Sequence, residues 1–140
     1  MPIDLTDDMR RELDEALANR NVVLVASASG AGVPDIAYKG SVMVWDAEHL
    51  AYWERSRGQT MRNLTENPNI CLMFRNPETR ISWKFFGEAQ VLDSGELREQ
   101  IMARANPLEL KQDPERKGAG VLIKINRVLE RGQPLMERDG

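Results

Sequence analysis

Cationic and hydrogen-bonding side chains gather between two apolar runs of the chain, Leu50–Trp53 and Ile70–Phe74. The segment between the runs reads as a turn followed by a short helix that stops at Asn67-Pro68. Its polar side chains are Arg55, Arg57, Gln59, Thr60 and Arg62. The free N–H groups and the dipole of a helix N-terminus attract anions, and guanidinium forks bind them bidentately, so a phosphate is the expected ligand. The alternative is a solvated arginine-rich turn that binds nothing.

The overall composition indicates one ordinary globular domain spanning residues 1–140. Hydrophobic residues make up 41% of the chain and charged residues 29%, and no apolar run reaches the roughly 20 residues that span a membrane. The net charge of −3 argues against bulk nucleic-acid binding, which a basic domain would favour. The acidic, polar N-terminus does not resemble a secretory signal, and the single cysteine fits a reducing compartment, so we expect a cytoplasmic protein.

The chain has one cysteine, Cys71, and one histidine, His49. A single cysteine cannot form an internal disulfide, and its place inside an apolar run predicts a small core residue of a strand. A zinc site is not expected, because His49 has no partner histidines or cysteines with ligand spacing. The G-x-S-x-G nucleophile elbow of hydrolases is also missing from the sequence.

Hydrophobic patterning predicts six strands, at residues 22–26, 35–45, 50–53, 69–74, 81–92 and 121–128. Two of them contain a mid-strand glycine, Gly40 or Gly87, which often marks a bulge or a close approach to the backbone. Most of the strands are joined by hairpin-like turns, so the pattern is typical of a small closed β-barrel. A Rossmann sheet is disfavoured, because there is no regular β-α alternation and no G-x-G-x-x-G.

Helices are predicted in three places. Thr6 can cap a helix that runs to about Ala18, and a second helix covers residues 60–66. Asp93 and Glu96 have the spacing of a capping box, which predicts a third helix ending near residue 105. Residues 108–120 are expected to form a loop, and the tail from residue 131 is expected to be irregular.

Several short motifs then occur in a fairly specific order. The main one is Thr60–Pro68, TMRNLTENP, followed by the strand at residues 69–74, and the others are Gly32-Val33-Pro34, Lys39-Gly40-Ser41 and Gly87-Glu88-Ala89. Over about residues 5–130 the chain resembles the FMN-binding split-barrel family related to pyridoxamine 5′-phosphate oxidase. The resemblance implies a six-stranded antiparallel split β-barrel with short flanking helices. It also implies a homodimer that binds FMN in clefts at the subunit interface.

The resemblance further implies which residues contact FMN. The edge of the isoalloxazine ring would lie along Lys39, Gly40 and Ser41, and the ribityl chain would pass Trp53 and Glu54. The phosphate would be bound by Arg57, Gln59, Thr60 and Arg62, with Asn63 close by. Ser82 and Trp83 would reach the flavin ring from the second subunit. Many family members carry a lysine where this chain has Thr60. Here the Thr60 hydroxyl would donate one hydrogen bond, and Arg57 or Arg62 would supply the positive charge. Arg55 is expected to point into solvent.

The expected function is that of a flavin-dependent oxidoreductase acting on a small molecule that no motif identifies. The cofactor would carry the chemistry, so no side chain is named as acid, base or nucleophile. Lys39 or Lys84 could place positive charge beside the flavin, although both also fit as solvated surface residues. The alternatives are a deazaflavin-dependent reductase of the same fold and a flavin-binding sensor without turnover.

The dimer has a sequence argument of its own. The segment ISWKFF, residues 81–86, would leave aromatic side chains on the outer face of the barrel. That exposed apolar area exceeds what a monomer of this size should show, so a two-fold, largely apolar interface is expected. The three tryptophans, Trp45, Trp53 and Trp83, fit core or interface positions better than flavin-stacking positions.

Overall fold

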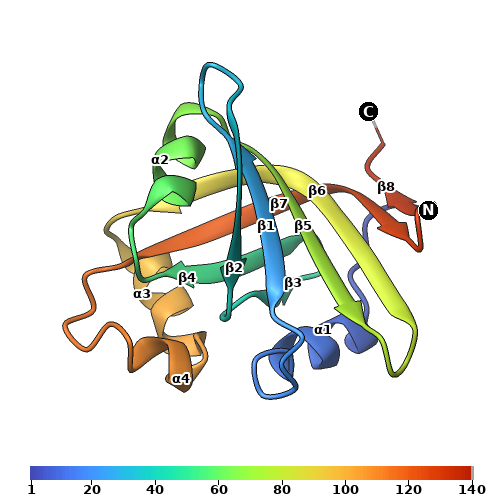
Figure 1. The fold of residues 1–140 in the computed structure, drawn as a ribbon, viewed down its shortest axis with the longest axis horizontal. Coiled ribbons are helices and arrows are strands. Elements are labelled where there is room, and N and C mark those ends of the chain that lie inside the picture. Colours follow the sequence, from blue (N-terminus) through green and yellow to red (C-terminus); the bar gives the residue numbers. More distant parts are fainter. Residues whose placement is uncertain (140) are drawn as a thin grey trace.

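Residues 1–139, which the computed structural model describes, form one antiparallel sheet of eight strands flanked by four helices (Figure 1). The strands are β1 (Val23–Ala28), β2 (Pro34–Lys39), β3 (Met43–Asp46), β4 (His49–Glu54), β5 (Asn69–Asn76), β6 (Ile81–Leu92), β7 (Ala119–Glu130) and β8 (Gln133–Glu137). The helices are α1 (Asp7–Asp14), α2 (Gln59–Glu66), α3 (Glu96–Arg104) and α4 (Pro107–Leu110).

The sheet curls into a barrel that stays open along one seam. Its strand order is β2-β1-β5-β6-β7-β4-β3, and β8 pairs with the far end of β7. Within residues 1–139 no ladder joins the two edge strands, β2 and β3, so the predicted split-barrel class is confirmed. In Figure 1, β1 and β2 pass in front of β4 and β7, and the core lies between these two halves.

Alternating side chains fill the barrel, as the period of two in a strand requires. Leu50 and Tyr52 of β4 point into this core, where they meet β1, β5, β6 and β7. The other face of β4 carries Ala51, which packs with Met43 and Ile101 in a smaller cluster under α3. One strand therefore separates the main core from the α3 layer.

The predicted strand 35–45 is wrong, because the chain forms two strands there. The chain leaves the ladder with β1 after Lys39 and joins a ladder with β4 at Met43. Between the two ladders the Ser41 hydroxyl bonds to both backbone groups of Trp53, accepting from the N–H at 2.9 Å and donating to the carbonyl at 3.2 Å. The Ser41 side chain thus bonds to β4 at the point where the backbone passes from the ladder with β1 to the ladder with β4. This break and the unpredicted β8 raise the strand count from six to eight.

The helix predictions are confirmed in place but not in every detail. Thr6 caps α1 by accepting a bond from the Met9 N–H at 3.1 Å, although the helix ends at Asp14 and not near Ala18. The prediction of a capping box at Asp93 and Glu96 is wrong, because α3 begins after Gly95 and has no side-chain cap. The Asp93 carboxylate is instead held by Arg57. The segment predicted as a loop also contains the short helix α4.

The outer face of the barrel differs from the one predicted. Trp83 and Phe85 of β6 point into the core, so residues 81–86 do not supply the exposed aromatic surface. Strand β2 carries exposed apolar side chains instead, since Ile36 is 63% exposed and Tyr38 71%, and Val33 and Leu108 are exposed elsewhere. Cys71 belongs to a strand as predicted, but it is only half-buried, on the outward face of β5. Among the described residues no helix is long and apolar enough to cross a membrane.

Candidate functional site

The turn from β4 into α2 is built around the buried carboxylate of Glu54. Glu54 follows Leu50 and Tyr52 on the inward face of β4 and is fully buried. Its Oε1 accepts from Lys39 Nζ at 2.8 Å, and its Oε2 accepts from the N–H and hydroxyl of Ser56 at 3.2 and 2.9 Å and from the Arg57 N–H at 3.2 Å. Four donors thus surround one carboxylate, which compensates for its burial.

The Glu54 carboxylate therefore accepts hydrogen bonds from turn donors that the sequence suggested for a bound phosphate. Successive backbone N–H groups in a tight turn form a concave anion site, and here Arg57 adopts a left-handed φ of 51° that points its N–H inward. The anion in that concavity belongs to the chain itself. An external phosphate would have to use the donors that come after this turn.

The two arginines nearest the turn are also neutralised by carboxylates of the chain. Arg57 lies 2.8 Å from Asp93 and donates to the Lys117 carbonyl at 3.2 Å. Arg55 does not point freely into solvent as predicted, because its Nε lies 2.8 Å from Glu109 Oε2. These partners lie far along the chain, so no local sequence signal could have identified them.

Helix α2 keeps its N-terminal donors available. Its N-cap is Gly58, which provides no side-chain cap, and Arg62 N is the first N–H of the helix to bond back to a carbonyl, that of Gly58. The Arg62 guanidinium donates to Gln59 at 3.0 Å, and Gln59 donates to Asn63 at 2.8 Å. Asn63 is buried and donates to Ser27 of β1 at 3.1 Å. This chain of bonds fixes the exposed end of α2 to the barrel.

Thr60 lies in the first turn of α2 with its side chain buried. A lysine at this position, as in many family members, would have to extend out of a buried place to reach an anion. The position therefore suits a small hydroxyl residue in this chain, and Arg62 is the exposed cation of this helix.

The backbone at Gly40 is covered by Glu109 of α4. The Glu109 carboxylate occupies the place that a Cβ on Gly40 would take, so a larger residue at position 40 would require the Glu109 side chain to move. Lys39, Gly40, Arg55 and Glu109 line a small hollow of about 60 Å³ beside the turn. Glu109 thus lies over the backbone that the resemblance assigned to the isoalloxazine edge.

Trp53 is held on the α3 side of β4. Its indole Nε1 donates to Asp113 at 2.9 Å, and the Arg98 guanidinium lies 4.9 Å from its ring centre. Asp113 also accepts from the N–H groups of Lys117 and Gly118, each at 2.9 Å. Burial would raise the pKa of Asp113, but these donors outweigh burial and leave the pKa below its usual value. Sequence analysis missed Asp113, because 60 residues separate it from Trp53.

Next to this turn lies a buried tyrosine, Tyr52. The Tyr52 hydroxyl is buried and makes no hydrogen bond with residues 1–139. Burial, and next the charge of Glu54, raise the pKa of Tyr52 well above its ordinary value. Tyr52 therefore stays neutral and acts as a bulky core residue.

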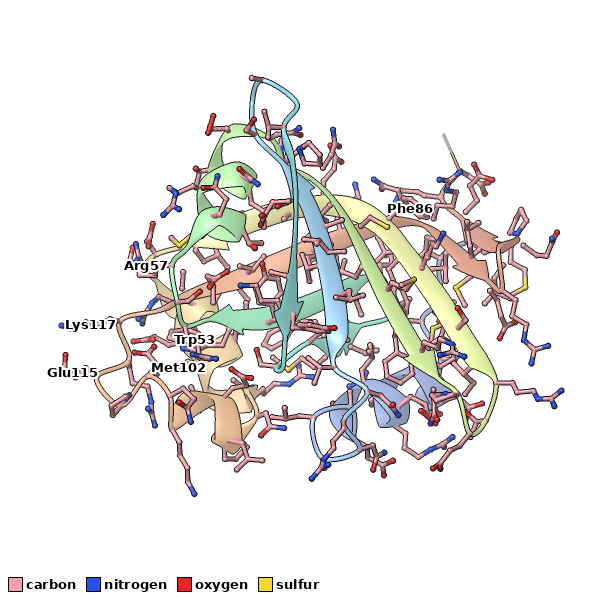
Figure 2. All side chains as sticks on the ribbon, viewed as in Figure 1. Trp53, Arg57, Phe86, Met102, Glu115 and Lys117 are labelled. Atoms are coloured by element: carbon pink, nitrogen blue, oxygen red, sulfur yellow. The ribbon has the colours of Figure 1, made fainter. Side chains whose placement is uncertain are left out.

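Ser82 and Trp83 lie at the other end of the barrel. In the sheet Trp53 pairs with Gly120 and Gly120 with Leu92, whereas Ser82 lies ten residues before Leu92 along β6. Ten residues of strand span about 33 Å, so one chain does not bring Ser82 to the turn. In Figure 2 Trp53, Arg57 and Lys117 lie together at one end of the molecule, and Phe86, also on β6, lies toward the other.

The fold and this arrangement can be compared with known proteins. The family model for pyridoxamine 5′-phosphate oxidase matches residues 9–129. The chain belongs to the pyridoxamine 5′-phosphate oxidase family. A relative from Methanocaldococcus jannaschii, an uncharacterized protein, is 30% identical over 128 residues, which cover 90% of this chain and 80% of the relative.

Two crystal structures with the same fold extend the comparison. HupZ of Group A Streptococcus is 25% identical with a TM-score of 0.70, and the match covers 97% of this chain and 99% of that chain. An FMN-binding protein of Syntrophomonas wolfei is 20% identical with a TM-score of 0.68, covering 89% and 90%. The second likeness concerns the fold alone.

The residues of this family member can be tested for their fit to FMN. The phosphate end fits, because the uncapped start of α2 lies beside Gln59 and the exposed Arg62. The ring edge fits once the Glu109 side chain leaves Gly40, which requires breaking its ion pair with the 43% exposed Arg55. The Glu109 side chain is 14% exposed, so the pair is only partly exposed, and a fully exposed pair is worth about 0–1 kcal/mol.

Proposed function

We propose that this protein is a homodimeric FMN-binding flavoprotein that catalyses an oxidoreduction of a small molecule. The observation that carries the proposal is the uncapped N-terminus of α2 with Gln59 and Arg62 in its first turn. Membership of the family and the fold shared with an FMN-binding protein support it. FMN would supply the electron-transfer chemistry, and the protein would bind and orient it.

The phosphate of FMN would lie at the start of α2. Arg62 would give a charge-assisted hydrogen bond, and Gln59 and the Thr60 N–H would donate beside it. Arg57 and Asn63 would support this clamp indirectly, through the turn at Glu54 and the bond to Ser27.

The rest of the cofactor would follow the seam of the barrel. The ring edge would lie along Lys39, Gly40 and Ser41, and the ribityl chain would pass Trp53 and Glu54. Lys39 is already bound to Glu54, so its positive charge is shared with a carboxylate at 2.8 Å. Lys84, exposed on β6, is the cation that a second subunit could bring to the ring.

A second copy of the chain would complete the site. Ser82 and Trp83 lie about 33 Å from the turn along β6, so only those of another subunit could approach the flavin. The exposed Ile36 and Tyr38 of β2 supply apolar surface for the interface. The composite site therefore requires the dimer.

Purified protein tests this proposal directly. We expect a yellow protein whose ligand is FMN by mass spectrometry, and whose flavin is reduced by a nicotinamide nucleotide. A colourless protein that binds only a deazaflavin would replace FMN with that cofactor. The carboxylates paired with Arg55 and Arg57 argue against it, because its longer acidic tail needs a broader cationic groove. Bound FMN that no nicotinamide nucleotide reduces would indicate a binding module.

A further inference from the structure

A hollow of about 320 Å³ lies beside the end of α1, where the chain passes from β2 to β3. Its walls come from α1, from the crossover between β2 and β3, and from the junction of α3 with α4. We call this space the α1 hollow, and its lining includes Leu13, Asp14, Val42, Met43, Arg104 and Asn106. None of these six residues has a part in the flavin site proposed above.

The crossover leaves backbone groups without partners beside this hollow. The ladder with β1 ends at Lys39, and the ladder with β4 begins at Met43. Between them the N–H and C=O groups of Gly40, Ser41 and Val42 make no backbone hydrogen bond within residues 1–139. Ser41 and Val42 are each only 4% exposed. Buried backbone groups are nearly always paired, so these groups indicate a surface that exchanges hydrogen bonds with a bound molecule.

Asp14 brings a negative charge to the hollow. It is the last residue of α1, where the partial negative charge of the helix C-terminus disfavours a carboxylate. Burial raises the pKa of Asp14, and the charges of Arg10 and Arg104 lower it only in part. None of the ion pairs formed within residues 1–139 includes Asp14, although Asp8 of the same helix lies 2.9 Å from Arg11. The protein itself therefore compensates the Asp14 carboxylate poorly.

The two arginines near Asp14 are bonded to β3. Arg104 donates to the carbonyls of Val44 and Trp45 at 3.1 and 3.3 Å, and its guanidinium lies 4.1 Å from the centre of the Trp45 ring. Arg10 donates to the same Val44 carbonyl at 3.1 Å. These bonds hold both guanidinium groups at the edge of β3, so the carboxylate oxygens of Asp14 stay free for a ligand.

The rest of the lining suits a small molecule with an apolar part. Leu13, Val42 and Met43 are buried apolar residues that line the hollow. The volume lies at the lower end of the range of about 300–1,000 Å³ that is usual for small-molecule sites. A ligand of one ring that carries a cationic hydrogen-bond donor would match the apolar wall, the free carbonyls and Asp14.

We propose that the α1 hollow binds a small organic cation with N–H donors, of the amidine or guanidine type. Its N–H groups donate to Asp14 and to the unpaired carbonyls of the crossover, because a charged donor and a carboxylate form a strong hydrogen bond. Its apolar part lies against Leu13, Val42 and Met43. This inference goes beyond the proposed function and does not depend on it.

NMR titration of the full chain tests the proposal with three probes that share one ring. Benzamidine is cationic, benzamide is neutral and benzoate is anionic, so the series changes the charge at nearly constant shape. At constant ionic strength we expect benzamidine to bind most tightly and to shift the amide signals of Gly40, Ser41 and Val42. Equal affinity for benzamidine and benzamide, tighter binding of benzoate, or no shift at these residues with any probe would overturn the proposal.

Variants of Asp14 test its role in the same titration. Asp14→Asn should weaken benzamidine binding about tenfold or more, because it removes a charge-assisted hydrogen bond. Asp14→Glu keeps the charge and should bind benzamidine more tightly than Asp14→Asn does. Glu15→Gln is the matched control, since it makes the same charge change at the next residue, which is exposed and does not line the hollow. Equal losses of affinity in Asp14→Asn and Glu15→Gln would contradict a direct contact between Asp14 and the cation.

Discussion

Lys39 Nζ lies 2.8 Å from Glu54 Oε1, and this ion pair joins β2 to β4 across the seam where no ladder connects them. The Lys39 side chain is 12% exposed and that of Glu54 is fully buried. One buried carboxylate therefore both bridges the opening of the barrel and organises the turn that leads into α2. The pair controls the shape of the candidate site as well as the stability of the fold.

Removing Lys39 should destabilise the protein strongly. Breaking a buried pair leaves a charge uncompensated and typically costs about 3–5 kcal/mol, and we expect the lower end because Glu54 retains three other donors. Urea unfolding of Lys39→Met measures the loss. The double variant with Glu54→Gln should lose less than the two single variants together. A loss no larger than that of Arg11→Ala, which breaks an exposed pair, would show that the bridge contributes little.

Arg62→Ala should weaken FMN binding about tenfold to a hundredfold and leave riboflavin binding nearly unchanged. A charge-assisted hydrogen bond is worth about 1.5–3 kcal/mol, and riboflavin has no phosphate to receive it. Fluorescence titration with both ligands measures the difference. Arg55 is not a suitable control, because it pairs with Glu109, so Arg11→Ala is the control. An equal loss of affinity for both ligands would show that Arg62 stabilises α2 and does not bind the phosphate.

Glu109→Gln should strengthen the binding of both FMN and riboflavin. The substitution weakens the contact with Arg55 that holds the side chain over Gly40, so the ring edge opens at lower cost. A pair worth up to about 1 kcal/mol corresponds to a gain of up to about fivefold. Glu115→Gln makes the same charge change at the exposed pair with Lys117 and should have no effect. Unchanged affinity in Glu109→Gln would mean that the ring does not approach Gly40.

Asp113→Asn should reduce the stability difference between neutral and acidic pH. The folded pKa of Asp113 is depressed, so its contribution to stability is complete above the usual carboxyl pKa of about 4 and is lost as the pH falls through the lower folded pKa. The variant should therefore be less stable at pH 7, and the gap should narrow below about pH 4. Chemical unfolding across this pH range measures it. A gap that stays constant with pH would show that the Asp113 charge does not stabilise the fold.

Charged substitutions on β2 should dissociate the dimer. Ile36→Asp and Tyr38→Asp place a carboxylate on side chains that are 63% and 71% exposed in the single chain, and burying an unpaired charge at an interface is costly. We expect a dimer for the unmodified protein and a monomer for both variants by sedimentation at micromolar concentration. Leu108→Asp, on an apolar side chain of α4 that is 53% exposed, should remain dimeric. An unmodified monomer would contradict the composite flavin site.

Most of the helices and strands, in their order along the chain, could be predicted from local sequence. The Thr6 cap, the helix that ends before Asn67-Pro68 and the strands at residues 69–74 and 81–92 all follow from local periodicity and capping chemistry. The motif order was specific enough to identify the split-barrel family. These features depend on residues close together in the chain, so the sequence carries them directly.

Which charges are available at the candidate site depends on contacts between distant parts of the chain. Arg55, Arg57 and Lys39 read as free cations in the sequence, yet each is paired with a carboxylate that lies 54, 36 or 15 residues further on (109 − 55, 93 − 57 and 54 − 39). The break after Lys39 could not be predicted for the same reason, because it depends on strand partners distant in sequence. There the chain leaves its ladder with β1 and joins one with β4. Ion pairs and strand partners are long-range contacts chosen by packing, and local patterns do not encode them.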